Sequence, residues 1–79
     1  MITNKEAVKT VVQYMKDIAE FMPSSDQRLE EIDYDDESNT WRVGVSFKEH
    51  SLSDEARICK RFAVDGDTAE VISMKNVIF

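Results

Sequence analysis

The chain has very little of the residue types from which disulfides, catalytic sites and tight turns are built. Its 79 residues include one cysteine, one histidine, one proline and two glycines. A single cysteine excludes an internal disulfide. One histidine and one cysteine leave few groups from which a nucleophile and its base could be assembled, so we expect no enzyme activity. We also expect no cofactor and no bound metal ion.

The chain also lacks a long hydrophobic run and an excess of positive charge. Charged residues interrupt the apolar positions of residues 1–22, which fits neither a signal peptide nor a membrane span. The formal net charge of −6 argues against non-specific binding to DNA or to an anionic membrane. We therefore expect a cytoplasmic protein without a membrane partner, and nucleic-acid binding is disfavoured.

The composition is that of one globular domain, residues 1–79. Hydrophobic residues make up 42% of the chain and charged residues 33%. A domain of this size buries only about 60% of the surface of its extended chain. At roughly 0.05–0.15 kcal/mol per residue, its free energy of unfolding is about 4–12 kcal/mol. Pairing with a second copy would add stability.

The first 22 residues have the periodicity of an amphipathic helix. Thr3-Asn4-Lys5-Glu6 has the Thr-x-x-Glu form of a capping box. Pro23 ends the pattern. The apolar stripe consists of Val8, Val11, Val12, Met15, Ile18, Ala19 and Met22. The sequence predicts a helix over about residues 3–22 that packs on the core of its own domain.

The rest of the chain has the period of two that is typical of half-buried strands. Strands are predicted over about residues 28–35, 40–48, 56–65 and 70–78. The clearest alternation is that of Trp41, Val43, Val45 and Phe47 with Arg42, Gly44 and Ser46. The segment Asp65-Gly66-Asp67-Thr68 predicts a hairpin turn.

The alternation also predicts which face each residue occupies. In the first strand, Ile32 and Tyr34 lie on one face, and Leu29, Glu31 and Asp33 on the other. The last two strands face the core with Ile58, Phe62, Val64, Ile72, Met74 and Ile78. Pairing Val64 with Ile72, Phe62 with Met74 and Ile58 with Ile78 places Lys60 opposite Asn76. The predicted fold is α+β: one N-terminal helix packed on a four-stranded antiparallel meander in two layers.

Two segments resemble PepSY-type domains. Trp41-Arg42-Val43-Gly44-Val45 matches a Trp-x-Val-x-Val strand, and Val64–Val71 matches a hairpin of the form Val-Asp followed by Thr-Gly-x-Val. The resemblance implies a small non-catalytic module, sometimes inhibitory towards peptidases. Ala69 stands where the family usually has glycine; because alanine is strained in a left-handed conformation, we expect the turn to use Gly66 instead. Members of the family are commonly exported, whereas no export signal is recognised here.

Two possible metal sites fail on their ligand sets. His50 lies near Glu49, Asp54 and Glu55, but zinc sites usually take three or four ligands, commonly with cysteine or several histidines. Asp33-x-Asp35-x-Glu37 has the spacing of a calcium loop. An EF-hand needs glycine at position six and glutamate at position twelve, where this chain has Ser38 and Gly44. We interpret both segments as solvated.

Cys59 is the one candidate nucleophile of the cysteine type. Neighbouring Lys60 and Arg61 would favour its thiolate. A catalytic cysteine also needs a base, which only His50 could supply, and an oxyanion site. We therefore interpret Cys59 as part of a surface.

The sheet face turned away from the helix is the best candidate site. By alternation it is locally basic, with apolar residues at one border, and Glu31 and Asp33 are expected to pair with Arg42. Val71 and Ser73 are assigned to the same face. The candidate partner-binding residues on it are Arg42, Lys48, Arg57, Cys59, Arg61, Lys75, Val77 and Phe79.

Three functional hypotheses remain. The leading one is a small non-catalytic protein-interaction module that binds a protein partner or a second copy through the open face or the last strand, whose apolar ending Val77-Ile78-Phe79 is unusual for a lone edge. The second is a peptidase-inhibitor-like role, which rests on the PepSY resemblance. The third is binding of a small ligand or a nucleic acid on the basic face; single-strand binders usually add exposed aromatics, whereas the strongest aromatics here face the core.

Overall fold

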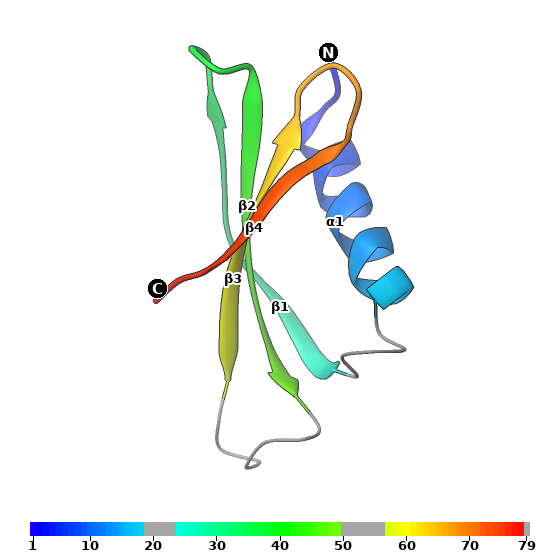
Figure 1. The fold of residues 1–79 in the computed structure, drawn as a ribbon, viewed down its shortest axis with the longest axis vertical. Helices are drawn as coiled ribbons and strands as arrows, with labels where there is room; N and C mark the ends of the chain where they lie inside the picture. Colours follow the sequence, from blue (N-terminus) through cyan, green and yellow to red (C-terminus); the bar gives the residue numbers. More distant parts are fainter. Residues whose placement is uncertain (19–23, 50–56, 79) are drawn as a thin grey trace.

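In the computed structural model, helix α1 (Asn4–Ile18) lies on one face of a four-stranded antiparallel sheet (Figure 1). The structure describes residues 1–18, 24–49 and 57–78. Within them, strands β1 (Ser24–Asp35), β2 (Thr40–Glu49), β3 (Ile58–Asp65) and β4 (Val71–Asn76) lie side by side in chain order. This confirms the predicted α+β fold. No helix of the described ranges is long and apolar enough to cross a membrane.

The helix begins at the predicted capping box. The Glu6 N–H donates to Thr3 Oγ1 over 3.2 Å, and the Thr3 N–H donates to Glu6 Oε1 over 3.3 Å. The buried row of the helix consists of Ala7, Val11 and Met15, at the four-residue spacing of one helical face. Val8 and Val12, which the sequence places on the same stripe, are half-buried beside this row. The predicted positions Ala19 and Met22 lie outside the described residues.

The core lies between α1 and the two central strands. Val43, Val45 and Phe47 of β2 and Phe62 and Val64 of β3 are all buried, as the alternation predicts. The ring of Tyr14 packs edge-on against Phe62, with centroids 5.8 Å apart. Burial of these apolar side chains is the main stabilising contribution to the fold.

A β-bulge changes the predicted pairing of β3 with β4. Phe62 pairs with Met74 and Lys60 with Asn76, as predicted, but Val64 pairs with Val71. The extra residue, Ile72, is 58% exposed. The predictions that Ile72 packs in the core and that Val71 lies on the open face are therefore wrong: Val71 packs against the core.

The end of β4 also differs from the prediction. The strand ends at Asn76, and Ile78 is 97% exposed. Ile78 is therefore no core residue opposite Ile58. An apolar side chain this exposed at the end of an edge strand is available to other molecules.

A bulge in β1 places Leu29 on a different face from the one that the sequence predicts. The register shifts between Leu29 and Glu31, so Leu29 lies opposite Val45, whose side chain is buried beneath α1. The single extra residue at Glu30 reverses the face of the residues before it, as far back as the next register shift at Arg28, because side chains alternate along a strand. Leu29 therefore does not share the face of Glu31 and Asp33.

The β3–β4 hairpin places its left-handed residue at Ala69 instead of Gly66. Ala69 has φ of 63°, and no glycine has positive φ among the described residues. The Ala69 N–H donates to Asp65 O over 3.1 Å, and the Asp65 N–H to Glu70 O over 2.8 Å. These bonds fix the left-handed residue at the end of the loop, so the expectation for Gly66 is wrong.

Replacing Ala69 by glycine is expected to raise the free energy of unfolding by about 0.5–1 kcal/mol. Glycine adopts positive φ without the steric cost that a Cβ imposes. Urea denaturation of A69G beside the wild type measures the difference. Asp67→Gly is the matched control in the same loop: Asp67 lacks a positive φ, so its replacement should lower stability.

Candidate functional site

The predicted partner-binding residues lie in rows across the sheet face opposite α1. Register places Arg42 beside Ala63 and Ser73, Arg61 beside Gly44 and Lys75, and Cys59 beside Ser46. The Val77 N–H donates to Cys59 O over 3.0 Å, which aligns Val77 with the last of these rows. Lys48 lies opposite Ser25 at the far end of β2. Phe79 lies outside the described residues.

The arginine of the first row is bound by a carboxylate of β1. Arg42 Nε and Nη2 donate to the two oxygens of Asp33 over 2.9 and 3.3 Å. The hydrogen bond to Asp33 raises the pKa of Arg42 above its ordinary value. The predicted pairing of Asp33 with Arg42 is confirmed, whereas Glu31 makes its ion pair with a different arginine.

Arg61 reaches from β3 over β2 to Glu31 on β1. Its Nε lies 2.6 Å from Glu31 Oε1, although strands two apart are separated by about 9.6 Å. Gly44 is the β2 residue between them in register. Because Gly44 has no side chain, the arginine can lie across β2 at this point.

A third arginine is held where β1, β2 and β3 meet. Arg57 donates through Nη1 to Asp26 Oδ2 and through Nη2 to the Asp26 carbonyl, both over 2.7 Å. Arg57 Nη2 also donates to Ser46 Oγ over 3.0 Å, and Ser46 Oγ donates to Glu30 Oε1 over 2.7 Å. Ser46 is only 2% exposed, so the network covers it from solvent. The same hydrogen bonds hold the first part of β1 against β2.

Asp26 is the carboxylate of this network that binds Arg57 directly. The hydrogen bond from Arg57 lowers the pKa of Asp26 below its ordinary value of 3.8, and the charge of Arg28 acts in the same direction. A carboxyl with a lower pKa in the folded state stabilises the fold above its unfolded pKa. That contribution is lost as the pH falls through the folded pKa.

Asp26→Asn is expected to lower stability at about pH 7 and to make stability less dependent on acid, because the variant has no proton to gain at this position. Urea denaturation at about pH 7 and about pH 3 measures both effects. Asp36→Asn is the control, since Asp36 is exposed and forms no ion pair with a described residue. Equal acid sensitivity of D26N and wild type would contradict the assignment.

The open face therefore offers less positive charge than its sequence suggests. Arg42, Arg57 and Arg61 all bind carboxylates of β1. Lys75 is exposed and forms no ion pair with a described residue. Ion pairs between the strands tie the charged side chains of this face to one another. Arginines paired in this way are poorly placed to bind phosphates or an acidic partner.

Among the described residues, neither the calcium-loop pattern nor Cys59 gains a further ligand or a catalytic partner. Within the described ranges, no three His, Cys, Asp or Glu side chains are grouped as metal ligands. Asp33 binds Arg42, and Asp35 Oδ1 accepts the Glu37 N–H. Cys59 is a half-buried free thiol, and the proposed base His50 lies outside the described residues.

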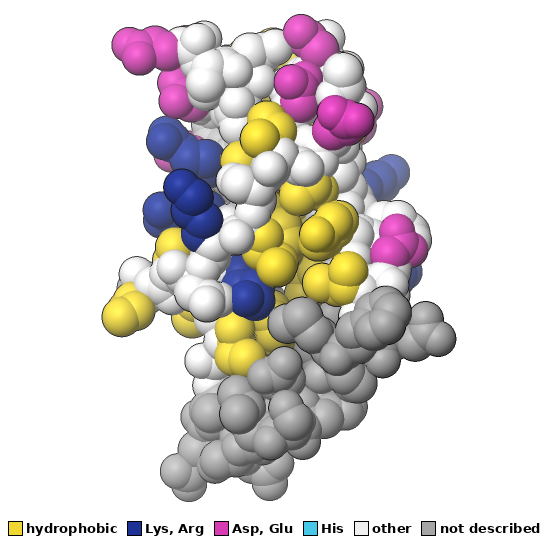
Figure 2. Space-filling view, in the orientation of Figure 1, with side chains coloured by type: hydrophobic (Ala, Val, Ile, Leu, Met, Phe, Trp, Pro, Cys, Tyr) yellow, Lys and Arg dark blue, Asp and Glu magenta, His cyan; other side chains and the backbone are white. Residues whose placement is uncertain are grey.

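The outer edge of β4 is the second predicted surface. The Val77 N–H points inward and bonds to Cys59 O on β3. Because backbone groups alternate in direction along a strand, this bond shows which residues of β4 point towards β3 and which point outward. The N–H and C=O groups of Met74 and Asn76 therefore point to the free edge. Figure 2 shows hydrophobic side chains gathered along the middle of the face that β4 and α1 form, with basic side chains to one side.

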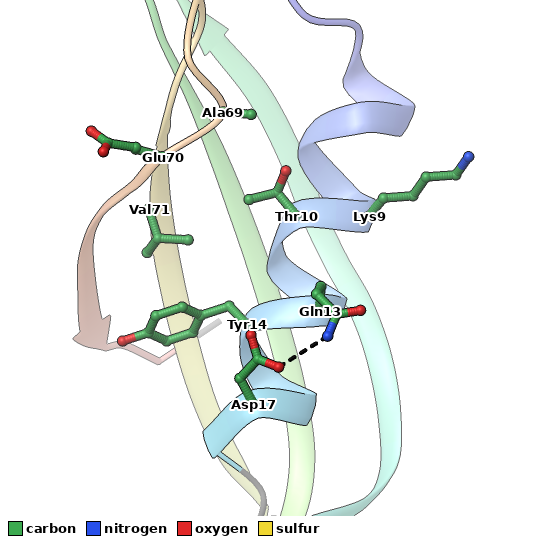
Figure 3. Close-up of a pocket in the computed structure, with 8 residues that line it drawn as sticks. All are labelled: Lys9, Thr10, Gln13, Tyr14, Asp17, Ala69, Glu70 and Val71. Carbon is green, nitrogen blue, oxygen red and sulfur yellow. Dashed lines mark hydrogen bonds between the residues drawn. The ribbon is translucent and has the colours of Figure 1, made fainter.

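A groove of about 720 Å³ separates α1 from the start of β4 (Figure 3). The side chain of Val71 points towards the helix, which agrees with its contact with the core. Gln13 Nε2 donates to Asp17 Oδ1 over 3.0 Å, so two of the polar groups at the groove bind each other. The groove is lined by Lys9, Thr10, Gln13, Tyr14, Asp17, Ala69, Glu70 and Val71.

Comparison of the chain with protein-family models, with curated proteins and with solved structures found no match. The PepSY resemblance stays a prediction from the two sequence segments that carry it. The surfaces described above are therefore the basis on which we propose a function.

Proposed function

We propose that the protein is a small non-catalytic interaction module that binds an extended strand at the outer edge of β4. The observation that carries the proposal is the outward-facing backbone of Met74 and Asn76, which bonds to no described residue and lies between two exposed isoleucines, Ile72 and Ile78. Addition of a strand would satisfy the backbone groups and cover apolar surface in one step. Of the two binding surfaces that the sequence predicts, the open sheet face and the last strand, we propose the last strand.

The opposite edge of the sheet is protected against such pairing. β1 carries two register shifts, and Asp26 within the first has φ of 53°. Bulges and charge are the usual means of keeping an edge strand unpaired. The charged residues of β1 are Asp26, Arg28, Glu30, Glu31, Asp33 and Asp35. In β4, by contrast, Lys75 alone is charged, and the bulge lies at the start of the strand.

The partner that we propose is a second copy of the chain. Antiparallel pairing of β4 with its own copy is isologous, so both copies contribute the same backbone groups and the same apolar side chains. A domain of 79 residues has little core, and it gains stability from joining two sheets into one. We further propose a cytoplasmic location, on the interrupted hydrophobic pattern of residues 1–22.

Sedimentation equilibrium of Asn76→Pro and Asn76→Ala tests the proposal. Both variants lose the acceptor that takes a hydrogen bond from Lys60 Nζ over 2.6 Å, but only the proline variant also loses the outward N–H. We expect the wild type and N76A to dimerise between micromolar and sub-millimolar concentration. We expect N76P to dimerise at least about tenfold more weakly, since each copy loses a hydrogen bond worth about 1 kcal/mol.

Two results would contradict the proposal. One is a wild type that stays monomeric over the whole concentration range. The other is equal dimerisation of N76P and N76A, which would place the contact on another surface. Circular dichroism of each variant shows whether the fold is kept. The peptidase-inhibitor hypothesis has no structural feature in its favour here, and the paired arginines weaken the hypothesis of ligand binding on the basic face.

A further inference from the structure

The helix leaves one strand of the sheet without a helical cover. α1 packs mainly against β2, β3 and β4. A sheet of four strands is about 19 Å wide at 4.8 Å per strand, whereas one helix with its side chains is about 10 Å across. One helix can therefore cover about half of the sheet face. Among the described elements, none covers the strip over β1 on the same side as α1.

That strip carries an apolar side chain, Leu29, that the sequence pattern assigned to the other face. The bulge at Glu30 sets Leu29 opposite Val45 on the helix side. Val45 is 6% exposed beneath the helix, but Leu29 is 52% exposed. Ile32 and Val8 are half-buried beside it. An exposed leucine on the core side of a sheet marks surface that the domain itself does not bury.

These residues line a groove of about 410 Å³ between the first turns of α1 and strand β1. Its lining consists of Asn4, Lys5, Val8, Lys9, Leu29 and Ile32. A smaller hollow of about 150 Å³ shares Val8 and Leu29 with it and extends along the helix towards Met15. No described residue in the lining of the groove or the hollow is acidic.

Two lysines form the rim of this groove. Lys5 and Lys9 are one helical turn apart, both are exposed, and neither forms an ion pair with a described residue. Figure 3 shows the Lys9 side chain extending away from β4, on the opposite side of the helix from Val71. In a chain of net charge −6, this rim is a local positive site beside an apolar floor.

We infer that this groove binds an amphipathic helix of a partner protein, with an aliphatic face on Val8, Leu29 and Ile32 and acidic residues against Lys5 and Lys9. The incoming helix lies beside α1 and covers β1, completing the helical layer over the sheet. A helix is favoured over a small ligand because the groove is open at the surface, whereas small-ligand sites bury about 70–90% of their ligand. This surface is separate from the β4 edge, and the inference does not depend on dimerisation.

The test uses a synthetic helical peptide with leucines at i, i+3, i+4 and i+7 and glutamates flanking them, titrated into isotope-labelled protein and followed by NMR. We expect the largest shift changes at the amides of Val8, Leu29 and Ile32. Leu29→Glu should weaken binding by at least about tenfold, because it places a carboxylate on the floor of the groove. The matched control is Thr68→Glu, which places the same carboxylate at an exposed position of the β3–β4 loop, outside both proposed surfaces, and should bind like the wild type.

The charged rim has its own test. The double variant K5E/K9E, at exposed helix positions that tolerate substitution, should weaken the acidic peptide and strengthen a peptide with lysine in place of glutamate. This variant also keeps the inference testable if Leu29→Glu does not fold. Absence of binding, equal binding by L29E and wild type, or shifts confined to the edge of β4 would each overturn the inference.

Discussion

Replacing Phe62 by alanine is expected to lower the free energy of unfolding by about 4 kcal/mol, the middle of the range for buried phenylalanines. Phe62 is 0% exposed and lies at the centre of the core, between β2, β4 and the helix. The substitution removes its apolar contacts, leaves a cavity and removes the edge-on contact with Tyr14. Since a domain of this size has about 4–12 kcal/mol in total, F62A should retain about 0–8 kcal/mol.

Urea denaturation followed by circular dichroism measures this loss. Ile72→Ala is the control, because Ile72 is 58% exposed and should contribute little. The two substitutions remove large apolar side chains of β3 and β4 that the sequence pattern assigned to the same core. A loss below about 1 kcal/mol for F62A, or an equal loss for I72A, would show that the core is packed differently.

Gly66→Ala is expected to cost about 2–3 kcal/mol, the upper part of the range for overpacking. A Cβ built on Gly66 would lie 2.3 Å from Asn39 Oδ1 and 2.8 Å from the Asn39 carbonyl oxygen. The Gly66 N–H donates to that carbonyl over 2.8 Å, and the Gly66 carbonyl accepts the Ile2 N–H over 2.7 Å. A side chain here must push the two hairpin loops apart and disturb the N-terminal segment.

The stability of A69G provides a direct comparison for that of G66A. G66A and A69G exchange the same two residue types three positions apart in one loop, and their effects should have opposite signs. Asn39→Gly in the G66A background should recover part of the loss, because it removes the nearer of the two clashing atoms. Equal stability of G66A and wild type would show that the loops are not in contact.

The elements of the fold could be predicted because each rests on a local pattern. The capping box at Thr3 and the alternation from Trp41 to Phe47 depend on neighbouring residues alone. The bulges at Glu30 and Ile72 could not be predicted in this way. An extra residue at Glu30 or Ile72 changes which face its neighbours occupy, and the position of a bulge is set by the partner strand.

For the candidate site too, the features that depend on local pattern could be predicted, and those that depend on neighbouring strands could not. Alternation correctly placed Arg42 and Arg61 on the face away from the helix. Their carboxylate partners depend on distances across strands: Arg61 reaches Glu31 only because Gly44 lies between them. The groove beside β1 was missed for a related reason, since the alternation assigned Leu29 to the other face.

Amide hydrogen exchange along β4 tests the central claim, that this edge binds a second copy, most directly. At low protein concentration, the amides of Met74 and Asn76 should exchange fast, while those of Ser73, Lys75 and Val77, which face β3, are protected. At high concentration, where the protein dimerises, Met74 and Asn76 should become protected as well. Association that leaves the exchange of these two amides unchanged would contradict the claim.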